Sequence, residues 1–211
     1  MKQFLFLLLF ISFGCRNSKK SFNYKFEKPK TKSIIGNFDG DKIQDTLREI
    51  VYSDKSQLQI DKVLTCKEYE FDTVVNWYFK NSIRHKLALS NHTSEMYFSY
   101  SMGFYFLKNI GDINNDGKDE VALAIDLLDY SRVNSCIIYT LCNNDWKEIK
   151  RFTIHEGAFD YYANEEPIFD EIKEYLENRN GIWHYHDYIE DAYENVEDVG
   201  KMKVLPLEKC N

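Results

Sequence analysis

An acidic loop that runs directly into an apolar strand, at residues 111–125, restricts the fold of this chain more than any other feature. Its acidic and amide residues alternate with other residue types, so a loop that curls around a cation can direct their oxygens inward. The oxygen donors are Asp112, Asn114, Asp116, the carbonyl of Lys118, and Glu120. Gly117 allows the tight bend that such a loop needs. The spacing predicts a calcium site, and the alternative is an Asx-rich turn without a metal.

A second copy of this pattern lies 75 positions upstream and predicts two related structural units. Residues 35–45 align with residues 110–120 without a gap, and an apolar segment follows each copy. The corresponding donors are Asn37, Asp39, Asp41, the carbonyl of Ile43, and Asp45. Lys42 replaces Gly117, and a side chain at a left-handed bend costs about 1–2 kcal/mol. We therefore expect this copy to bind calcium more weakly, or to form an ordinary turn.

Both copies resemble the FG-GAP and VCBS repeats of integrin-like β-propellers and of many bacterial surface proteins. The resemblance covers residues 35–51 and 110–126. An EF-hand would need a bidentate glutamate at the twelfth loop position, where this chain has Leu123, so a loop between strands is favoured. Propellers of this kind use about seven such units, and this chain has two copies. The resemblance thus implies propeller-blade-like units with a calcium loop, and not a full propeller.

Hydrophobic periodicity predicts a mainly β, antiparallel fold with one C-terminal helix. The predicted strands are residues 47–51, 57–63, 83–89, 94–102, 104–108, 121–125, 136–142, 146–154, 182–189 and 201–207. Turn residues at 52–56 predict a hairpin between 47–51 and 57–63, and those at 143–145 predict one between 136–142 and 146–154. Residues 72–79 fit a helix or a strand. Asn164 as an N-cap and Pro167 in the first turn predict the helix, which would end near Asn180-Gly181.

The body of the chain, residues 33–211, is long enough for one substantial core, and we expect a single β-rich domain. The two related units would span about 35–62 and 110–155. Residues 98–106 are rich in aromatic side chains, which we expect to be buried in the core. The alternative for this aromatic stripe is an exposed platform that binds sugars.

The first 32 residues predict export and a membrane anchor. A ten-residue apolar run at residues 4–13 is typical of a signal peptide and is too short to span a bilayer. Cys15 after a small residue resembles a bacterial lipobox, so residues 1–15 would be a lipoprotein signal peptide with Cys15 lipidated; ordinary cleavage is the alternative. Residues 16–32 form a basic linker. We expect a bacterial cell-envelope protein on the periplasmic face of the outer membrane.

The charge distribution argues against a nucleic-acid partner. The chain has 27 basic and 34 acidic residues, and the first 32 residues hold eight of the basic and one of the acidic residues. The remaining body therefore carries a net charge of −14. A phosphate backbone would be repelled by such a body. A protein or a glycan is the expected partner, together with the membrane that the lipid anchor enters.

Four cysteines remain besides Cys15, an even number that permits disulfides in an oxidising compartment. They are Cys66, Cys136, Cys142 and Cys210. In one extended strand, Cys136 and Cys142 would lie on the same face about 20 Å apart. A bond from either to a distant cysteine is therefore easier than a bond between them, and unpaired thiols are the alternative.

The segment His184-Tyr185-His186-Asp187 is the other place with potential chemistry. Alternation along a strand puts both histidines on one face, as two zinc ligands would require. A hydrolase site would need a third group such as His155, and the chain has no HExxH, GxSxG or Walker motif. We therefore expect structural histidines and no enzyme.

Taken together, these features predict a calcium-stabilised, membrane-anchored envelope lipoprotein that acts as a binding or interaction module. One alternative is an inhibitor or immunity-type lipoprotein that blocks an envelope enzyme through its acidic surface. Another is a hydrolase built on His184 and His186.

Overall fold

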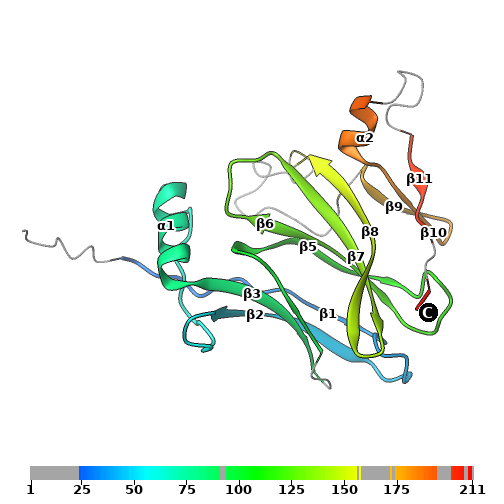
Figure 1. Cartoon of the computed structure of the whole chain (residues 1–211), viewed down its shortest axis with the longest axis horizontal. Helices are drawn as coiled ribbons and strands as arrows, with labels where there is room; N and C mark the ends of the chain where they lie inside the picture. Colours follow the sequence, from blue (N-terminus) through cyan, green and yellow to red (C-terminus); the bar gives the residue numbers. More distant parts are fainter. Residues whose placement is uncertain are drawn as a thin grey trace, which may run out of the picture.

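The computed structural model describes residues 24–90, 94–155, 157, 172, 174–193, 201–206 and 209–210. Within these residues the chain forms two four-stranded sheets, one three-stranded sheet and two short helices (Figure 1). All strand pairs are antiparallel, which confirms the predicted mainly β, antiparallel fold. No described helix is both long and apolar enough to cross a bilayer. Cys15 and the predicted signal peptide lie outside the described residues.

The first sheet is a meander in which neighbouring strands follow one another along the chain. Its strands are β1 (Ser33–Gly36), β2 (Asp45–Ser53), β3 (Ile83–Leu89) and β4 (Glu95–Tyr97). Helix α1 (Phe71–Asn81) connects β2 to β3 and buries Val74 and Tyr78. The ambiguous residues 72–79 are therefore helical. The helix ends at Ser82, which has a left-handed backbone with φ 54° and donates its N–H to the carbonyl of Phe79.

The predicted strand at residues 57–63 is wrong, because both edges of β2 are largely taken by other strands. β3 pairs with β2 from Leu47 to Ser53, and β1 pairs with it from Asp45 to Arg48. Residues 57–63 make only isolated bridges, one to Tyr52 and one to Glu27. The predicted turn before this segment does form, because Ser53 donates its N–H to the carbonyl of Leu58.

The second sheet repeats the meander without a helix. Its strands are β5 (Ser101–Gly111), β6 (Glu120–Leu127), β7 (Val133–Cys142) and β8 (Asp145–His155), in that order. Asn143 and Asn144 connect β7 to β8 with φ values of 51° and 68°. Two left-handed residues make the tight turn that suits a twisted hairpin, and asparagine tolerates that conformation. The predicted hairpin at residues 136–154 is confirmed.

The third sheet is small and contains a correction. Its order is β11 (Lys203–Val204), β10 (Ile182–Tyr185), β9 (Leu176–Arg179), and helix α2 (Tyr188–Tyr193) follows β10. The predicted helix was expected to continue to Gly181, but its last turn is β9. Asn180 and Gly181 have φ values of 56° and 86° and form a hairpin turn, not a helix cap. The start of that predicted helix, at Asn164 and Pro167, lies outside the described residues.

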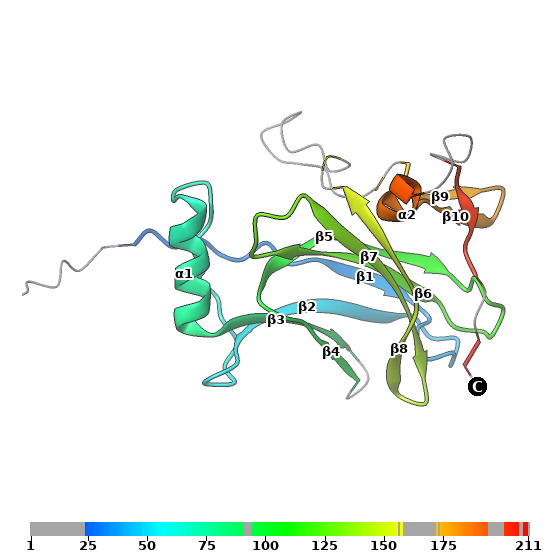
Figure 2. The same cartoon turned by 45° about the horizontal axis from the view of Figure 1, so that its top comes forward.

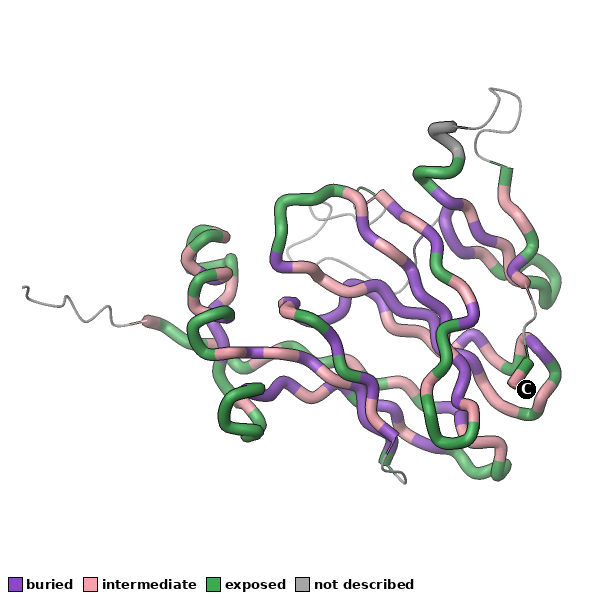
Figure 3. Tube along the Cα trace, viewed as in Figure 1, coloured by how far each residue is buried: buried purple, intermediate pink, exposed green. Residues whose placement is uncertain are grey.

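The second sheet is the middle layer of the molecule (Figure 2). One face packs on the first sheet, where Leu47 and Leu87 meet Leu123. The other face packs on the third sheet, where Ala124 and Phe152 belong to the same core as several of its residues. Burial is therefore continuous at the start of β6, whereas buried and partly exposed positions alternate along much of β2 (Figure 3).

The aromatic stripe at residues 98–106 contributes to these cores, as predicted. Phe98 and Phe104 are buried between the first and second sheets with their rings 4.9 Å apart. Phe106 is buried on the other face of the second sheet. Tyr100 differs, because it is only half-buried and packs at an angle against the ring of Phe79 of α1.

Candidate metal loops

The two acidic loops occupy the same place in their sheets. The first loop, residues 37–44, joins β1 to β2 and lies between the paired residues Gly36 and Asp45. The second loop, residues 112–119, joins β5 to β6 and lies between the paired residues Gly111 and Glu120. In both cases the loop connects the first two strands of a four-stranded meander.

The backbone of the two loops turns left-handed at two aligned positions. In the second loop these are Asn115, with φ 57°, and Gly117, with φ 90°. In the first loop they are Gly40, with φ 85°, and Lys42, with φ 71°. Lys42 therefore has the strained conformation that its alignment with Gly117 predicts.

Each loop is held by the same three hydrogen bonds from backbone N–H groups to side-chain oxygens. In the first loop the donors and acceptors are Lys42 to Asn37 Oδ1 (3.0 Å), Asp41 to Asp39 Oδ1 (2.9 Å) and Ile43 to Asp41 Oδ1 (2.7 Å). In the second loop they are Gly117 to Asp112 Oδ2 (2.9 Å), Asp116 to Asn114 Oδ1 (2.9 Å) and Lys118 to Asp116 Oδ1 (3.1 Å). The sequence repeat is thus a repeat of hydrogen bonding.

The second loop closes on Glu120, whose side chain is fully buried. Glu120 Oε2 accepts a hydrogen bond from the N–H of Ile113 (2.9 Å), and Oε1 accepts one from Asn114 Nδ2 (3.0 Å). Burial, with a smaller contribution from the charges of Asp116 and Asp112, raises the pKa of Glu120 to about 7. Ionised Glu120 is therefore disfavoured unless a positive charge lies nearby.

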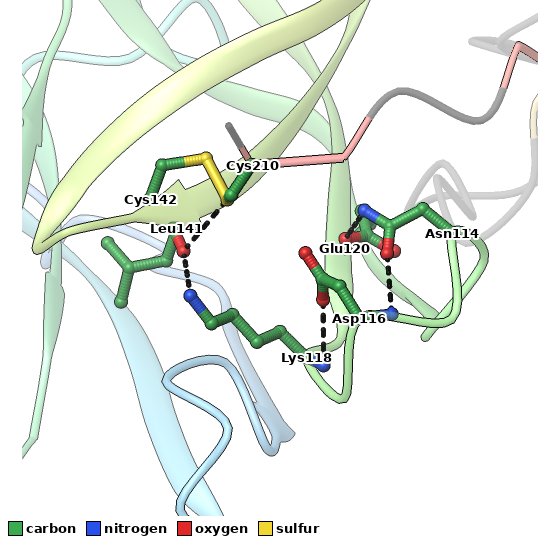
Figure 4. Close-up of a disulfide and its surroundings, with 7 residues drawn as sticks. All are labelled: Asn114, Asp116, Lys118, Glu120, Leu141, Cys142 and Cys210. Atoms are coloured by element: carbon green, nitrogen blue, oxygen red, sulfur yellow. Dashed lines mark hydrogen bonds between the residues drawn. A yellow bond between two sulfur atoms is a disulfide. The ribbon is translucent and has the colours of Figure 1, made fainter.

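One carboxylate oxygen of the second loop has no hydrogen-bond donor among the residues that the structure describes. Asp116 Oδ2 is buried and has no hydrogen-bond partner in the described structure. The amine of Lys118 does not reach these carboxylates, because it donates to the carbonyl of Leu141 (2.7 Å; Figure 4). Within the described chain, no three His, Cys, Asp or Glu side chains are grouped so as to hold a metal ion. Three side-chain oxygens in each loop accept hydrogen bonds from backbone N–H groups instead.

The C-terminal segment is attached beside the second loop by a disulfide between Cys142 and Cys210 (Figure 4). Their Cα atoms are 5.4 Å apart, and Lys209 Nζ donates to the carbonyl of Asn115 (3.4 Å). The expectation of a distant partner is therefore met for Cys142. Cys136 is buried and Cys66 is exposed, and both are free thiols, as the alternative allowed.

The two loops also contact each other through groups that the sequence did not single out. The N–H of Asn37 donates to Asp119 Oδ2 (2.9 Å), and the N–H of Asp119 donates to the carbonyl of Asn37 (2.9 Å). Asn109 Nδ2 donates to the same Asp119 oxygen (2.8 Å). A Cβ on Gly36 would lie 2.4 Å from Asn109 Nδ2 and 2.8 Å from Asp119 Oδ2, so a larger residue would have to displace the side chains that make this contact. The sequence holds one hint of this contact, because Asp119 is an additional acidic residue between the predicted ligands Lys118 and Glu120.

The three histidines considered for a hydrolase have separate partners. His184 Nδ1 lies 3.1 Å from the carbonyl of Ile182, and His186 stacks on Tyr175 with ring centroids 5.1 Å apart. His155 contacts the ring of Tyr188, 5.1 Å away. The described contacts therefore do not bring the three imidazoles to one shared group.

Sequence reasoning missed a buried ionisable pair between the first two sheets. His85 Nδ1 lies 2.6 Å from Glu49 Oε1, and both side chains are almost fully buried. Glu49 Oε2 accepts a hydrogen bond from the N–H of Lys32 (2.9 Å), whereas His85 Nε2 has no partner in the described structure. A Cβ on Gly103 would lie 3.0 Å from Glu49 Oε1, so glycine leaves room for the pair. The available signal was two polar residues at inward positions of apolar strands.

No protein-family model, curated protein or solved structure matches this chain significantly. The resemblance to FG-GAP and VCBS repeats therefore stays a prediction that rests on the two loops. The geometry of these loops is the basis for the functional proposal that follows.

Proposed function

We propose that this protein is a calcium-stabilised lipoprotein of the bacterial cell envelope that acts as a binding module. The observation that carries the calcium proposal is the second loop, which closes on a fully buried carboxyl group, Glu120. Two further carboxylates raise the pKa of this group, and the lysine of the loop donates elsewhere. A bound cation would supply the positive charge that this arrangement lacks.

The donor set fits calcium in chemistry. A hard cation takes six to eight oxygen ligands, and the second loop offers oxygens only. They come from Asp112, Asn114, Asp116, the carbonyl of Lys118, and Glu120. A carboxylate oxygen that accepts one backbone N–H keeps a lone pair for a cation, so the observed hydrogen bonds are compatible with binding. Bound calcium would hold the loop by charge and would take no part in a reaction.

The first loop is proposed as the weaker site of the two. Its donors are Asn37, Asp39, Asp41, the carbonyl of Ile43, and Asp45. Lys42 carries backbone strain there and adds a positive charge beside the donors. The side-chain amide of Asn37 also donates to the carbonyl of Gly117 (2.9 Å), which ties this loop to its neighbour.

Each four-stranded meander with its loop is proposed as a propeller-blade-like unit. Propeller blades are four-stranded antiparallel sheets, and both large sheets here have that form. The aligned loops at β1–β2 and β5–β6 support a common origin for the two units. The second unit extends over residues 101–155, and the first includes the inserted helix α1.

An envelope location and a lipid anchor on Cys15 complete the proposal. The disulfide between Cys142 and Cys210 supports an oxidising compartment. Cys15→Ala should release the protein from the membrane fraction or block its processing, because no acyl chain could then be attached. Normal processing with unchanged fractionation would contradict the anchor.

Calorimetric titration of the full chain with calcium tests the metal proposal directly. We expect binding at the second loop, with magnesium as the control ion, because magnesium demands a tighter octahedral shell. Saturating calcium at about a hundred times the dissociation constant should stabilise the fold by about 2.7 kcal/mol. If no heat of binding is detected at millimolar calcium, the calcium proposal fails.

A further inference from the structure

A cleft of about 530 Å³ lies beside helix α1, at the opposite end of the molecule from the two acidic loops (Figure 1). One face of α1 contributes Thr73, Asn76, Trp77 and Lys80, which recur at helical spacing. Tyr24 and Tyr69, from segments that precede the helix, also line it. Ligand sites for small molecules commonly have volumes of about 300–1,000 Å³, so the cleft is large enough for a ligand.

The aromatic rings of this cleft are supported by other rings. Tyr24 meets Tyr69 with ring centroids 5.6 Å apart, and Phe26 meets Trp77 at 5.7 Å. Trp77 also contacts the buried ring of Tyr78 at 5.4 Å. Such edge-on contacts stabilise ring positions. Trp77 therefore presents a positioned, half-buried aromatic surface to the cleft.

Three polar side chains on the helix face of the cleft are available to a ligand, whereas the side-chain amide of Asn81 donates to the carbonyl of Trp77 (2.8 Å). In the described part of the chain, the side chains of Thr73, Asn76 and Lys80 make no hydrogen bond or ion pair. The amide of Asn76 and the hydroxyl of Thr73 each offer a donor and an acceptor. No carboxylate side chain belongs to the lining. The cleft thus combines aromatic surface with neutral groups that both donate and accept and with one cation, Lys80, whose amine can donate to hydroxyl groups.

This combination matches the chemistry of a sugar. A pyranose ring has an apolar C–H face that can lie against an aromatic ring, and its hydroxyls both donate and accept hydrogen bonds. A purely apolar ligand would make no use of the amide of Asn76 or the hydroxyl of Thr73. A proline-rich peptide fits aromatic grooves but offers mainly carbonyl acceptors, so the acceptors of Asn76 and Thr73 would lack donors.

We propose that this cleft binds a short neutral oligosaccharide, with one sugar face on the ring of Trp77 and hydroxyls bonded to Asn76 and Thr73. The inference rests on the proposed function only in that it names the ligand class of the binding module. The calcium loops lie at the far end of the molecule, so saccharide binding should be independent of the metal.

The test uses the full-length chain in detergent, titrated with cellotetraose, chitotetraose and maltotetraose and followed by calorimetry and tryptophan fluorescence. At least one tetrasaccharide should bind, with a dissociation constant of about 1 mM or lower. Trp77→Ala should weaken binding at least about tenfold, because it removes the stacking surface. Phe79→Ala is the matched control, since Phe79 is an exposed aromatic residue of the same helix outside the lining. It should change binding less than about twofold.

Asn76→Ala provides a second variant, because Asn76 is exposed and its loss should not disturb the core. It should weaken binding severalfold while the melting temperature stays unchanged. The proposal fails if no tetrasaccharide binds at about 10 mM, or if Phe79→Ala and Trp77→Ala lose binding equally. Binding of a polyproline peptide or of lipid vesicles in place of sugar, lost in Trp77→Ala, would also overturn it.

A chelator separates the two proposals. If saccharide binding persists in chelator and calcium has no measurable effect, the saccharide proposal stands and the calcium proposal fails. If calcium stabilises the protein but no saccharide binds, the calcium proposal stands and the saccharide proposal fails.

Discussion

The first and second loops share a backbone path and three hydrogen bonds but differ at the residues that govern cation binding. At the second left-handed position the first loop has Lys42 and the second has Gly117, with φ values of 71° and 90°. The second loop also turns its lysine amine away, toward Leu141, and is fastened to the C-terminal segment by Lys209. A repeat can therefore preserve its scaffold while single side chains change what the scaffold can bind.

The layers around the two loops differ as well. β6, which follows the second loop, is covered on both faces, whereas β2, which follows the first, has an alternating pattern over its first half. This explains why four consecutive apolar residues at 121–124 are fully buried. The second loop is thus anchored to a strand whose first five residues are all buried, and a change in the charge of the loop should affect stability strongly.

The largest expected effect concerns Glu120 and pH. Burial raises the pKa of this residue from 4.5 to about 7 in the folded chain. The folded chain then holds a proton that the unfolded chain releases, so stability is full below about pH 4.5 and falls as the pH rises toward 7. In the presence of a chelator, the free energy of unfolding of the unmodified protein should fall by on the order of 3 kcal/mol over this pH range. In Glu120→Gln this fall should be absent. Urea denaturation across this pH range measures the free energy of unfolding of both proteins. An equal decrease in the unmodified protein and in Glu120→Gln would contradict the effect of burial.

Next in size is the difference in calcium response between the loops. Calcium at about a hundred times the dissociation constant should raise stability by about 2.7 kcal/mol and the melting temperature by several degrees. Asp116→Ala should abolish most of this shift, because it removes a ligand from the stronger site. Asp41→Ala, at the aligned position, should abolish little of it. Equal losses in thermal melts would refute the asymmetry between the loops.

A smaller effect should follow from exchanging the residues at the left-handed position. A Cβ on Gly117 meets no atom within 4 Å, so Gly117→Lys introduces backbone strain without a steric clash. We expect it to destabilise by about 1–2 kcal/mol and to weaken calcium binding about tenfold. Lys42→Gly should strengthen binding at the first loop. Calorimetric titration of both variants measures the change, and an unaltered affinity in Gly117→Lys would show that strain is unimportant.

The smallest expected effect concerns the contact between the loops. Asp119→Ala removes the acceptor shared by Asn37 and Asn109 and should destabilise by about 1 kcal/mol. Because this contact joins the two units, the variant should also make the calcium response of the first loop independent of the second. Asp129→Ala, a change of an exposed aspartate away from both loops, is the matched control. Unfolding by guanidinium chloride measures the stability of both variants. If Asp119→Ala has the same unfolding midpoint as Asp129→Ala, the contact between the loops does not stabilise the fold.

The sequence by itself determined the features that depend on neighbouring residues. β3 has the predicted bounds, and the Asn143-Asn144 hairpin forms as expected, because alternation and turn chemistry act locally. The alignment of Lys42 with Gly117 also predicted a left-handed bend that the backbone has. The same local information left 72–79 undecided between helix and strand.

Only the tertiary structure decided between local options of similar energy. Asn180-Gly181 can cap a helix or turn a hairpin, and the pairing of β9 with β10 selects the hairpin. Residues 57–63 have strand propensity, but β1 and β3 already occupy most of both edges of β2. The bonds between Asn37 and Asp119 and between Cys142 and Cys210 join residues far apart in the chain. Such contacts cannot be predicted from spacing, because they depend on which surfaces the packed sheets bring together.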